Sequence, residues 1–117
     1  MGANPMDVVA RCVESVSRDV SDVREIARRC SLYSVYTAYV AAPRIDVLKK
    51  WFESLSDEEK CVLTHRWRGS SIRRAAEVCG VSVSRARSIL RKWGDPFSDS
   101  ELMNEAADLS LIEGGLP

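Results

Sequence analysis

The amino-acid sequence predicts an all-α protein. Apolar residues recur at spacings of three and four positions along most of the chain, which is the period of a helix with one buried face. No segment shows the strict alternation of apolar and polar residues that a half-buried strand requires. The four prolines, at positions 5, 43, 96 and 117, fall between the periodic segments, where helices begin or end.

The length and composition limit the class of protein. With 117 residues, 45% of them apolar and 29% charged, the chain suits one small globular core and is too short for a large catalytic barrel. No run approaches the roughly 18 continuous apolar residues of a membrane span. The first residues also lack the basic and apolar regions of a signal peptide. We therefore expect an intracellular, cytoplasmic protein without a membrane partner.

The first predicted element is one long helix from Pro5 to at least Cys30. Its apolar residues are spaced alternately by three and four positions, as in a heptad seam: Met6, Val9, Val13, Val16, Val20, Val23, Ala27 and Cys30. Such a narrow stripe suits packing either against the chain's own helices or against a second copy. In the second interpretation the dimer interface consists of Val9, Val13, Val16, Val20 and Val23.

A tyrosine-rich helix is expected next, over residues 32–42. Tyr33, Tyr36 and Tyr39 recur every three residues, which suits core or interface packing better than the stacking of nucleic-acid bases. Pro43 ends this segment, and a further helix over residues 45–55 places Ile45, Leu48 and Leu55 on one side, together with Trp51 or Phe52. Residues 1–54 thus form a helical region with a predicted role in dimerisation.

Residues 55–93 contain the signals of three short helices. Ser56 and Glu59 form a capping box for the first, which ends at Gly69. Ser71 caps the second, and Ser82 caps a third that runs to Trp93.

The second and third helices fit a helix-turn-helix. Ala75 and Ala76 are small enough for two helices to cross closely, Gly80 permits a sharp turn with positive φ, and Val81 fills the angle.

Charge is sorted along the chain although the net charge is zero. Residues 44–93 carry twelve Lys or Arg against six acids, whereas residues 94–117 carry six acids and no basic residue. Thirteen of the 17 basic residues are Arg, which suits bidentate contacts to phosphate and guanine. No acid occurs between Ser82 and Trp93, and the apolar face of that helix consists of Ala86, Ile89, Leu90 and Trp93. The opposite, basic face predicts a recognition helix for double-stranded DNA.

The same residues resemble a known family. Three motifs carry the resemblance: Leu-x-x-x-Glu-x-x-Val-Leu-x-x-Arg-Trp from Leu55, Gly-x-Ser-Ile-x-x-Ala-Ala from Gly69, and Gly-Val-Ser-x-Ser-Arg-x-Arg from Gly80. They are similar to the tetrahelical helix-turn-helix of bacterial sigma factor region four and of LuxR-type response regulators, over a third of the chain. The resemblance implies base-reading positions at Val83, Ser84, Arg85, Arg87 and Ser88. Phosphate contacts are expected from Arg68, Ser71, Arg73, Arg74, Arg91 and Lys92. Because this sequence contains no recognisable promoter-melting or receiver domain, we do not expect a complete sigma factor.

Metal binding and catalysis are not expected. Cys12, Cys30, Cys61 and Cys79 lack C-x-x-C spacing and the chain has a single histidine, so a zinc site is disfavoured. Small buried thiols are the favoured interpretation, and disulfides, with three possible pairings, are the alternative. His65 has no neighbouring nucleophile or carboxylate at a recognisable spacing. No cofactor is implied.

The last segment, residues 94–117, is expected to be an acidic amphipathic helix. Ser98 and Glu101 form a capping box, and the apolar residues are Leu102, Met103, Ala106, Leu109 and Ile112. This helix either closes the fold, competes with DNA for the basic region, or docks on a partner protein.

These patterns together predict a transcriptional regulator that is not an enzyme and that reads an inverted repeat in DNA as a homodimer. The alternative is a protein-interaction adaptor in which the helix-turn-helix serves only as a scaffold. A remnant of a transposase or recombinase is a third hypothesis, for which no catalytic cluster is visible.

Overall fold

The computed structural model describes residues 5–97, and these residues form seven helices. In chain order the helices are α1 (Pro5–Ser17), α2 (Val23–Arg29), α3 (Val35–Ala41), α4 (Asp46–Ser54), α5 (Asp57–Trp67), α6 (Ile72–Cys79) and α7 (Val83–Trp93). Apart from one isolated β-bridge, the described residues contain no β-structure, so the all-α prediction is confirmed. The predicted acidic helix from Ser98 onward lies outside the described residues.

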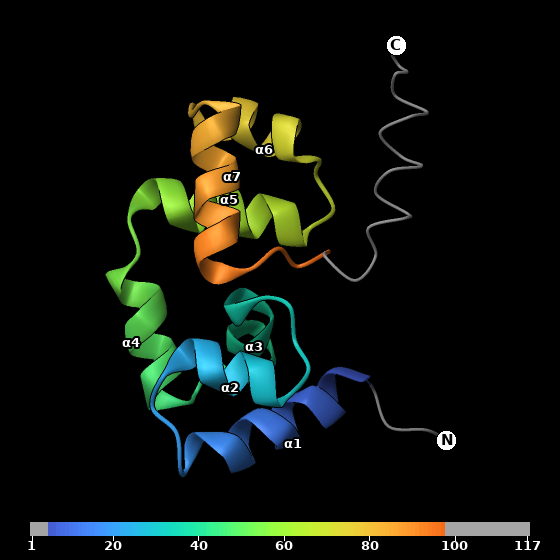
Figure 1. Cartoon of the computed structure of the whole chain (residues 1–117), viewed down its shortest axis with the longest axis vertical. Helices are drawn as coiled ribbons and strands as arrows, with labels where there is room; N and C mark the ends of the chain where they lie inside the picture. Colours follow the sequence, from blue (N-terminus) through green and yellow to red (C-terminus); the bar gives the residue numbers. More distant parts are fainter. Residues whose placement is uncertain (1–4, 98–117) are drawn as a thin grey trace.

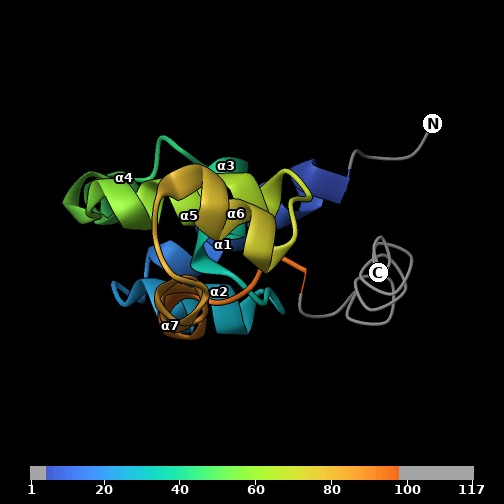
Figure 2. The ribbon, with the colours of Figure 1, turned by 90° about the horizontal axis from the view of Figure 1, so that it is seen from above.

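The helices form two groups joined by α4. Figure 1 shows α1, α2 and α3 together at one end, α5, α6 and α7 at the other, and α4 along one side. Seen from above in Figure 2, α7 is viewed nearly along its axis, while α5 and α6 lie across it. No helix among residues 5–97 is both long enough and apolar enough to cross a bilayer.

The prediction of one continuous N-terminal helix is wrong. The chain leaves the helix after Ser17 and begins again at Val23, where the Asp22 carboxylate accepts a hydrogen bond of 3.0 Å from the Arg24 backbone N–H. Short polar side chains such as Asp favour this capping conformation over the interior of a helix. The break folds α2 back toward α1, so that Val13 and Ile26 are both fully buried.

The fold settles how the valine seam packs. Val13 has no exposed surface, and Val9, Val16, Val20 and Val23 pack, partly buried, against the same core. Of the two interpretations of the seam, the structure shows packing against the chain's own helices. Val13 therefore offers no surface to a second copy, whereas a dimer contact through the four partly buried valines stays a prediction.

Two disulfides pair all four cysteines, contrary to the favoured interpretation as buried thiols. Cys12 is joined to Cys30 and Cys61 to Cys79, each with Cα atoms 5.8 Å apart and 18 residues apart in sequence. In an unbroken helix, Cys12 and Cys30 would lie about 27 Å apart along the axis, so the first disulfide depends on the break. Each crosslink joins consecutive helices within one group, α1 to the end of α2 and α5 to α6.

One hydrophobic core extends through both groups. Its fully buried side chains include Leu48 from α4, Leu63 from α5 and Ile89 from α7, as well as Val13 and Ile26. The predicted boundary between residues 54 and 55 therefore does not separate two cores, because residues on both sides of it belong to the same hydrophobic cluster.

The tyrosine-rich segment contributes to this core through an aromatic cluster. Tyr36 is 8% exposed and Tyr39 stacks on Phe52 with ring centroids 4.4 Å apart. Tyr36 also meets Trp67 edge-on, and its hydroxyl oxygen lies 3.2 Å from the Thr64 hydroxyl of α5. The expected core role is confirmed for these two tyrosines. Tyr33 instead precedes α3 and is 57% exposed.

Trp93, at the end of α7, connects the two groups. Its ring meets that of Trp51 edge-on at 5.4 Å, and the Arg24 guanidinium lies 5.5 Å from its centroid. Its indole N–H donates a 2.9 Å hydrogen bond to the Glu59 carboxylate of α5. α7 is thus fixed at its C-terminal end, while its N-terminal end is at the far end of the molecule (Figure 1).

Candidate nucleic-acid interface

The helix-turn-helix region begins and ends at the residues that its capping signals predict. The Ser71 and Ser82 hydroxyls each accept a 3.0 Å hydrogen bond from a backbone N–H three residues later. Gly80 ends α6 with φ of +69°, a left-handed conformation in which glycine carries no steric penalty. Ser56 and Glu59 form the predicted capping box at the start of α5. All four predictions are confirmed.

Small residues set the packing of α6 and α7. Ala75, Ala76 and Ala86 are at most 2% exposed, so the two helices approach each other without large side chains between them. Ile89 and Leu90 complete the inner face of α7, and Trp93 is partly buried at its end. The predicted inward face is therefore confirmed.

The outer face of α7 is polar, basic and exposed. Ser84, Arg87, Ser88 and Arg91 all lie at the surface. Within residues 5–97, no carboxylate lies within ion-pair distance of Arg87 or Arg91. Both guanidinium groups therefore keep their donors available to a ligand.

Two of the predicted base-reading residues are placed less favourably. The Arg85 guanidinium pairs with Glu58 of α5 at 3.1 Å, and both side chains remain about half exposed, at 47% and 51%. Val83 is partly buried and packs against the core. Of the predicted reading face, Ser84, Arg87 and Ser88 are thus exposed without an ion pair, whereas Arg85 is exposed but paired with Glu58.

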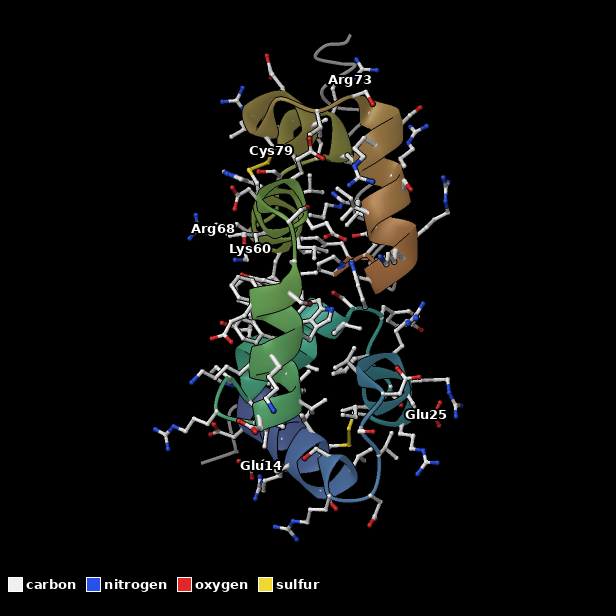
Figure 3. The ribbon with its side chains drawn as sticks, turned by 90° about the vertical axis from the view of Figure 1, so that its left-hand side faces the viewer. Glu14, Glu25, Lys60, Arg68, Arg73 and Cys79 are labelled. Carbon is white, nitrogen blue, oxygen red and sulfur yellow. A yellow bond between two sulfur atoms is a disulfide. The ribbon has the colours of Figure 1, made fainter. Side chains whose placement is uncertain are left out.

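The predicted phosphate-binding residues are spread over α5, α6 and α7, and Figure 3 shows Arg68 on the side of α5 that faces away from α7. Arg68 is the exposed C-cap of α5, and Arg73 and Arg74 are exposed in the first turn of α6. Arg74 pairs with Glu77 at 3.0 Å, but both side chains are at least 64% exposed. Exposed pairs of this kind contribute about 0.2–1 kcal/mol, so a phosphate can replace the carboxylate. The remaining members are Ser71, Arg91 and Lys92, and the Lys92 ammonium lies 5.0 Å from the Trp93 ring centroid.

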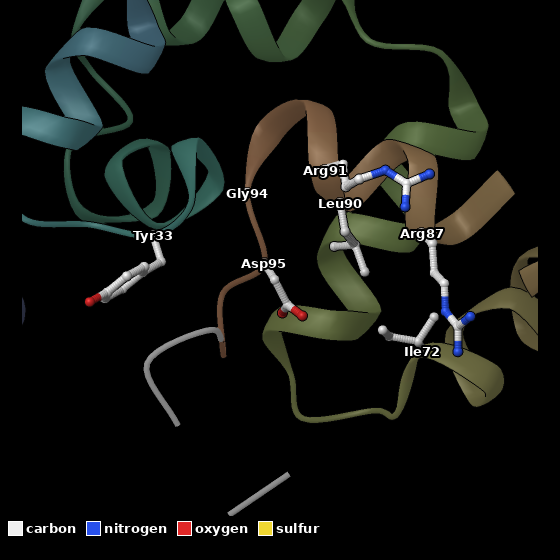
Figure 4. A pocket seen from close by; sticks show the side chains of 7 residues that line it. All are labelled: Tyr33, Ile72, Arg87, Leu90, Arg91, Gly94 and Asp95. Carbon is white, nitrogen blue, oxygen red and sulfur yellow. The ribbon is translucent and has the colours of Figure 1, made fainter. Parts of the chain in front are cut away.

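A hollow of about 360 Å³ lies beside the basic face of α7. Arg87, Leu90 and Arg91 of α7 line it together with Ile72 of α6 and the exposed Tyr33. Figure 4 shows the Arg87 side chain extending toward Ile72, with Tyr33 on the opposite side. This hollow brings together residues from α6, α7 and the segment before α3 that sequence analysis did not connect.

A buried ion pair that no sequence pattern predicted supports this region. Arg66 is 6% exposed, and its guanidinium donates to both carboxylate oxygens of Asp95 at 3.0 and 3.2 Å. The same group donates to the Ser70 carbonyl at 2.9 Å and lies over the Phe97 ring. Arg66 therefore ties the α5–α6 connection to the chain that leaves α7. Arg66 lies four residues after Val62 and three after Leu63, so it falls on the buried side of α5. This spacing is the sequence signal that distinguishes Arg66 from the exposed arginines around it.

The Glu59 carboxylate also holds the C-terminal end of α7, through Trp93. Burial alone would raise its pKa, but hydrogen bonds from the Ser56 backbone N–H and the Trp93 indole outweigh this effect and lower the pKa of Glu59. The carboxylate is thus ionised in the folded protein and holds Trp93 in place.

The chain matches no family profile, no curated protein and no solved structure. The similarity of residues 55–93 to sigma factor region four and LuxR-type modules therefore stays a prediction from their motifs.

Proposed function

We propose that this protein binds double-stranded DNA, with α7 entering the major groove. The observation that carries the proposal is the outer face of α7, where Arg87 and Arg91 are exposed and unpaired within residues 5–97. A helix with its side chains is about 10–12 Å wide, which matches the width of the major groove. The small serines 84 and 88 flank Arg87 without blocking its approach to base edges.

Exposed arginines also occur on the two helices that pack against α7, although Figure 3 shows Arg68 on the side of α5 that faces away from α7. Arg68 and Arg73 are exposed on α5 and α6, and neither has a carboxylate within ion-pair distance among the described residues. Between Lys60 and Trp93 the sequence has only one acid, Glu77, against nine Lys or Arg. Such an excess of cations beside a recognition helix supports phosphate contacts, which position a protein on the duplex.

The proposal includes transcriptional regulation by two copies on an inverted repeat. One short recognition helix buries too little surface for useful specificity, and a second copy doubles it. Because Val13 has no exposed surface, it does not contribute to the contact between the two copies.

Selection of binding sites from random duplex DNA tests the proposal, with the mass of the protein–DNA complex measured by light scattering. The expected result is an enriched inverted repeat bound by two chains. Enrichment of a single half-site bound by one chain would support sequence-specific DNA binding but contradict the dimer. Binding that is sequence-blind and lost at moderate salt would contradict the regulator and favour the adaptor hypothesis.

A further inference from the structure

Three side chains that commonly bind metal ions meet on the outer side of α5 and α6. They are Cys61 and His65 of α5 and Cys79, the last residue of α6. One ligand atom from each lies within 4.8 Å of the other two. Cys61 and Cys79 are joined as a disulfide, and Figure 3 shows this bond beside the Cys79 label, between the two helices.

The arrangement follows from the helix geometry. Cys61 and His65 are four residues apart, so they lie one turn apart on the same face of α5. All three residues are partly exposed, so the group lies at the surface of the protein rather than in its core. Among residues 5–97, no third histidine, cysteine or carboxylate completes a comparable group at the Cys12–Cys30 disulfide.

We propose that reduction of the Cys61–Cys79 disulfide creates a Zn²⁺ site formed by Cys61, His65 and Cys79. A dithiol reductant transfers two electrons and two protons to the disulfide; its S–S bond breaks, two thiols form, and the dithiol becomes a disulfide. Zn²⁺ then binds both sulfurs as thiolates and releases their two protons. The neutral His65 ring donates a nitrogen lone pair, and a water molecule takes the fourth position.

The distances suit this exchange. With Zn–S bonds of about 2.3 Å and Zn–N bonds of about 2.0 Å, tetrahedral ligand atoms lie within about 4 Å of one another. The three ligand atoms already lie within 4.8 Å of one another, so binding needs the two sulfurs to separate by about 2 Å and the imidazole to approach them by about 1 Å. Sequence spacing disfavours zinc because no C-x-x-C pair is present, but the fold brings the ligands together from two helices.

The site has a structural consequence for the pair of helices. The disulfide and the bound ion both hold the C-terminal end of α6 against α5, whereas the reduced, metal-free chain lacks this link. The inference is independent of DNA binding, because it concerns only the state of the α5–α6 link.

Titration of the anaerobically reduced full chain with Co²⁺ tests the proposal. Co²⁺ bound by thiolates in a tetrahedral site gives a charge-transfer band and visible d–d bands, and added Zn²⁺ displaces it. We expect one ion per chain, loss of both band systems in Cys79→Ser, and binding about 100-fold weaker in His65→Gln. The matched control is the double variant Cys12→Ser/Cys30→Ser, which should retain the bands.

Two further measurements keep the test decisive if reduction unfolds part of the chain. Zn²⁺ should restore helical circular dichroism, since binding then drives folding. Zn²⁺ should also protect Cys61 and Cys79, but not Cys12 and Cys30, from alkylation. Failure of the reduced chain to bind Co²⁺, unchanged affinity in His65→Gln, or equal protection of all four cysteines would each overturn the site.

Discussion

The backbone of Tyr33 lies directly against Gly94, where an isolated antiparallel bridge joins Ser34 to Gly94. A Cβ atom on Gly94 would overlap the Tyr33 carbonyl oxygen and lie 2.7 Å from the Ser34 Cα. Gly94 also has φ of +98° and donates its N–H to the Leu90 carbonyl at the end of α7. A glycine at this position therefore permits close contact between the two helix groups.

Replacing Gly94 with Ala should destabilise the fold by more than the backbone strain alone. A non-glycine residue at such a φ costs about 1–3 kcal/mol, and the overlap with backbone atoms adds to it. The measurement is the free energy of unfolding in urea. Gly69→Ala is the matched control, because Gly69 has φ of +103° but no atom within 4 Å of its added Cβ. Equal losses in the two variants would show that the contact with Tyr33 contributes nothing.

Replacing Arg87 with Ala should weaken binding to the selected DNA site by about 1–3 kcal/mol and relax the preference at one base position. The reason is the loss of a bidentate donor from the exposed face of α7. Fluorescence anisotropy against the selected site and its single-base variants measures both effects. Arg11→Ala removes the same charge from an exposed position on α1 and should leave the preference unchanged. If Arg87→Ala keeps the parent's preference, Arg87 is not a base-reading residue.

Removing the Cys12–Cys30 disulfide as Cys12→Ser/Cys30→Ser should lower the free energy of unfolding by about 3 kcal/mol. Closing a loop of this length restricts the unfolded chain, and that restriction is lost in the variant. Thermal unfolding of the oxidised proteins gives the comparison. Because α7 is held by Trp51 and Glu59, affinity for DNA below the melting temperature should be retained. A loss of DNA affinity in the folded variant would show that the first disulfide also shapes the interface.

Stability should fall between about pH 4.5 and pH 2 through Glu25. Side-chain hydrogen bonds from Arg28 and Arg29 lower the pKa of Glu25 from 4.5 to about 2. The folded state therefore favours the carboxylate, and this contribution is complete above pH 4.5 and lost as the pH falls to about 2. An NMR titration of the Glu25 side chain should report the low midpoint, and Arg28→Gln should move it upward. A midpoint at the ordinary value in the parent protein would refute the prediction.

Removing residues 98–117 should raise non-specific affinity for DNA at low salt. This segment carries five acids and no Lys or Arg, so its loss changes the net charge from zero to +5. The gain should shrink as salt screens the charges. In a control variant, the segment is kept and its five acidic residues are replaced by their amides. This variant tests whether the negative charge of the segment or its presence over the basic face weakens DNA binding. If the deletion raises affinity and the amide variant does not, the segment acts by covering the basic face.

Elements governed by local hydrogen bonding were predictable from sequence. Ser56, Ser71 and Ser82 cap their helices as expected, because each cap needs only a backbone N–H a few residues away. The break before α2 carried a similar signal at Asp22, but the valine heptad continues across it and favoured one long helix. The periodicity of apolar residues does not reveal a break between helices when their three-and-four spacing continues across the break.

Contacts between distant segments were not predictable in the same way. The Arg66–Asp95 pair joins residues 29 positions apart, and the cysteine pairing depends on how α1 meets α2 and α5 meets α6. The outer face of α7 was predicted because it is one side of one helix. The hollow shared by Tyr33, Ile72 and Arg87 required the packing of three elements.

The two disulfide loops follow one another along the chain without overlapping, since Cys30 precedes Cys61. During synthesis the first crosslink can therefore close before the second cysteine pair has emerged. Each native disulfide joins two cysteines that are 18 residues apart in sequence. A wrong disulfide such as Cys12–Cys79 would close a much longer loop, which costs more conformational entropy. The order of the cysteines thus favours correct oxidation without a pairing catalyst.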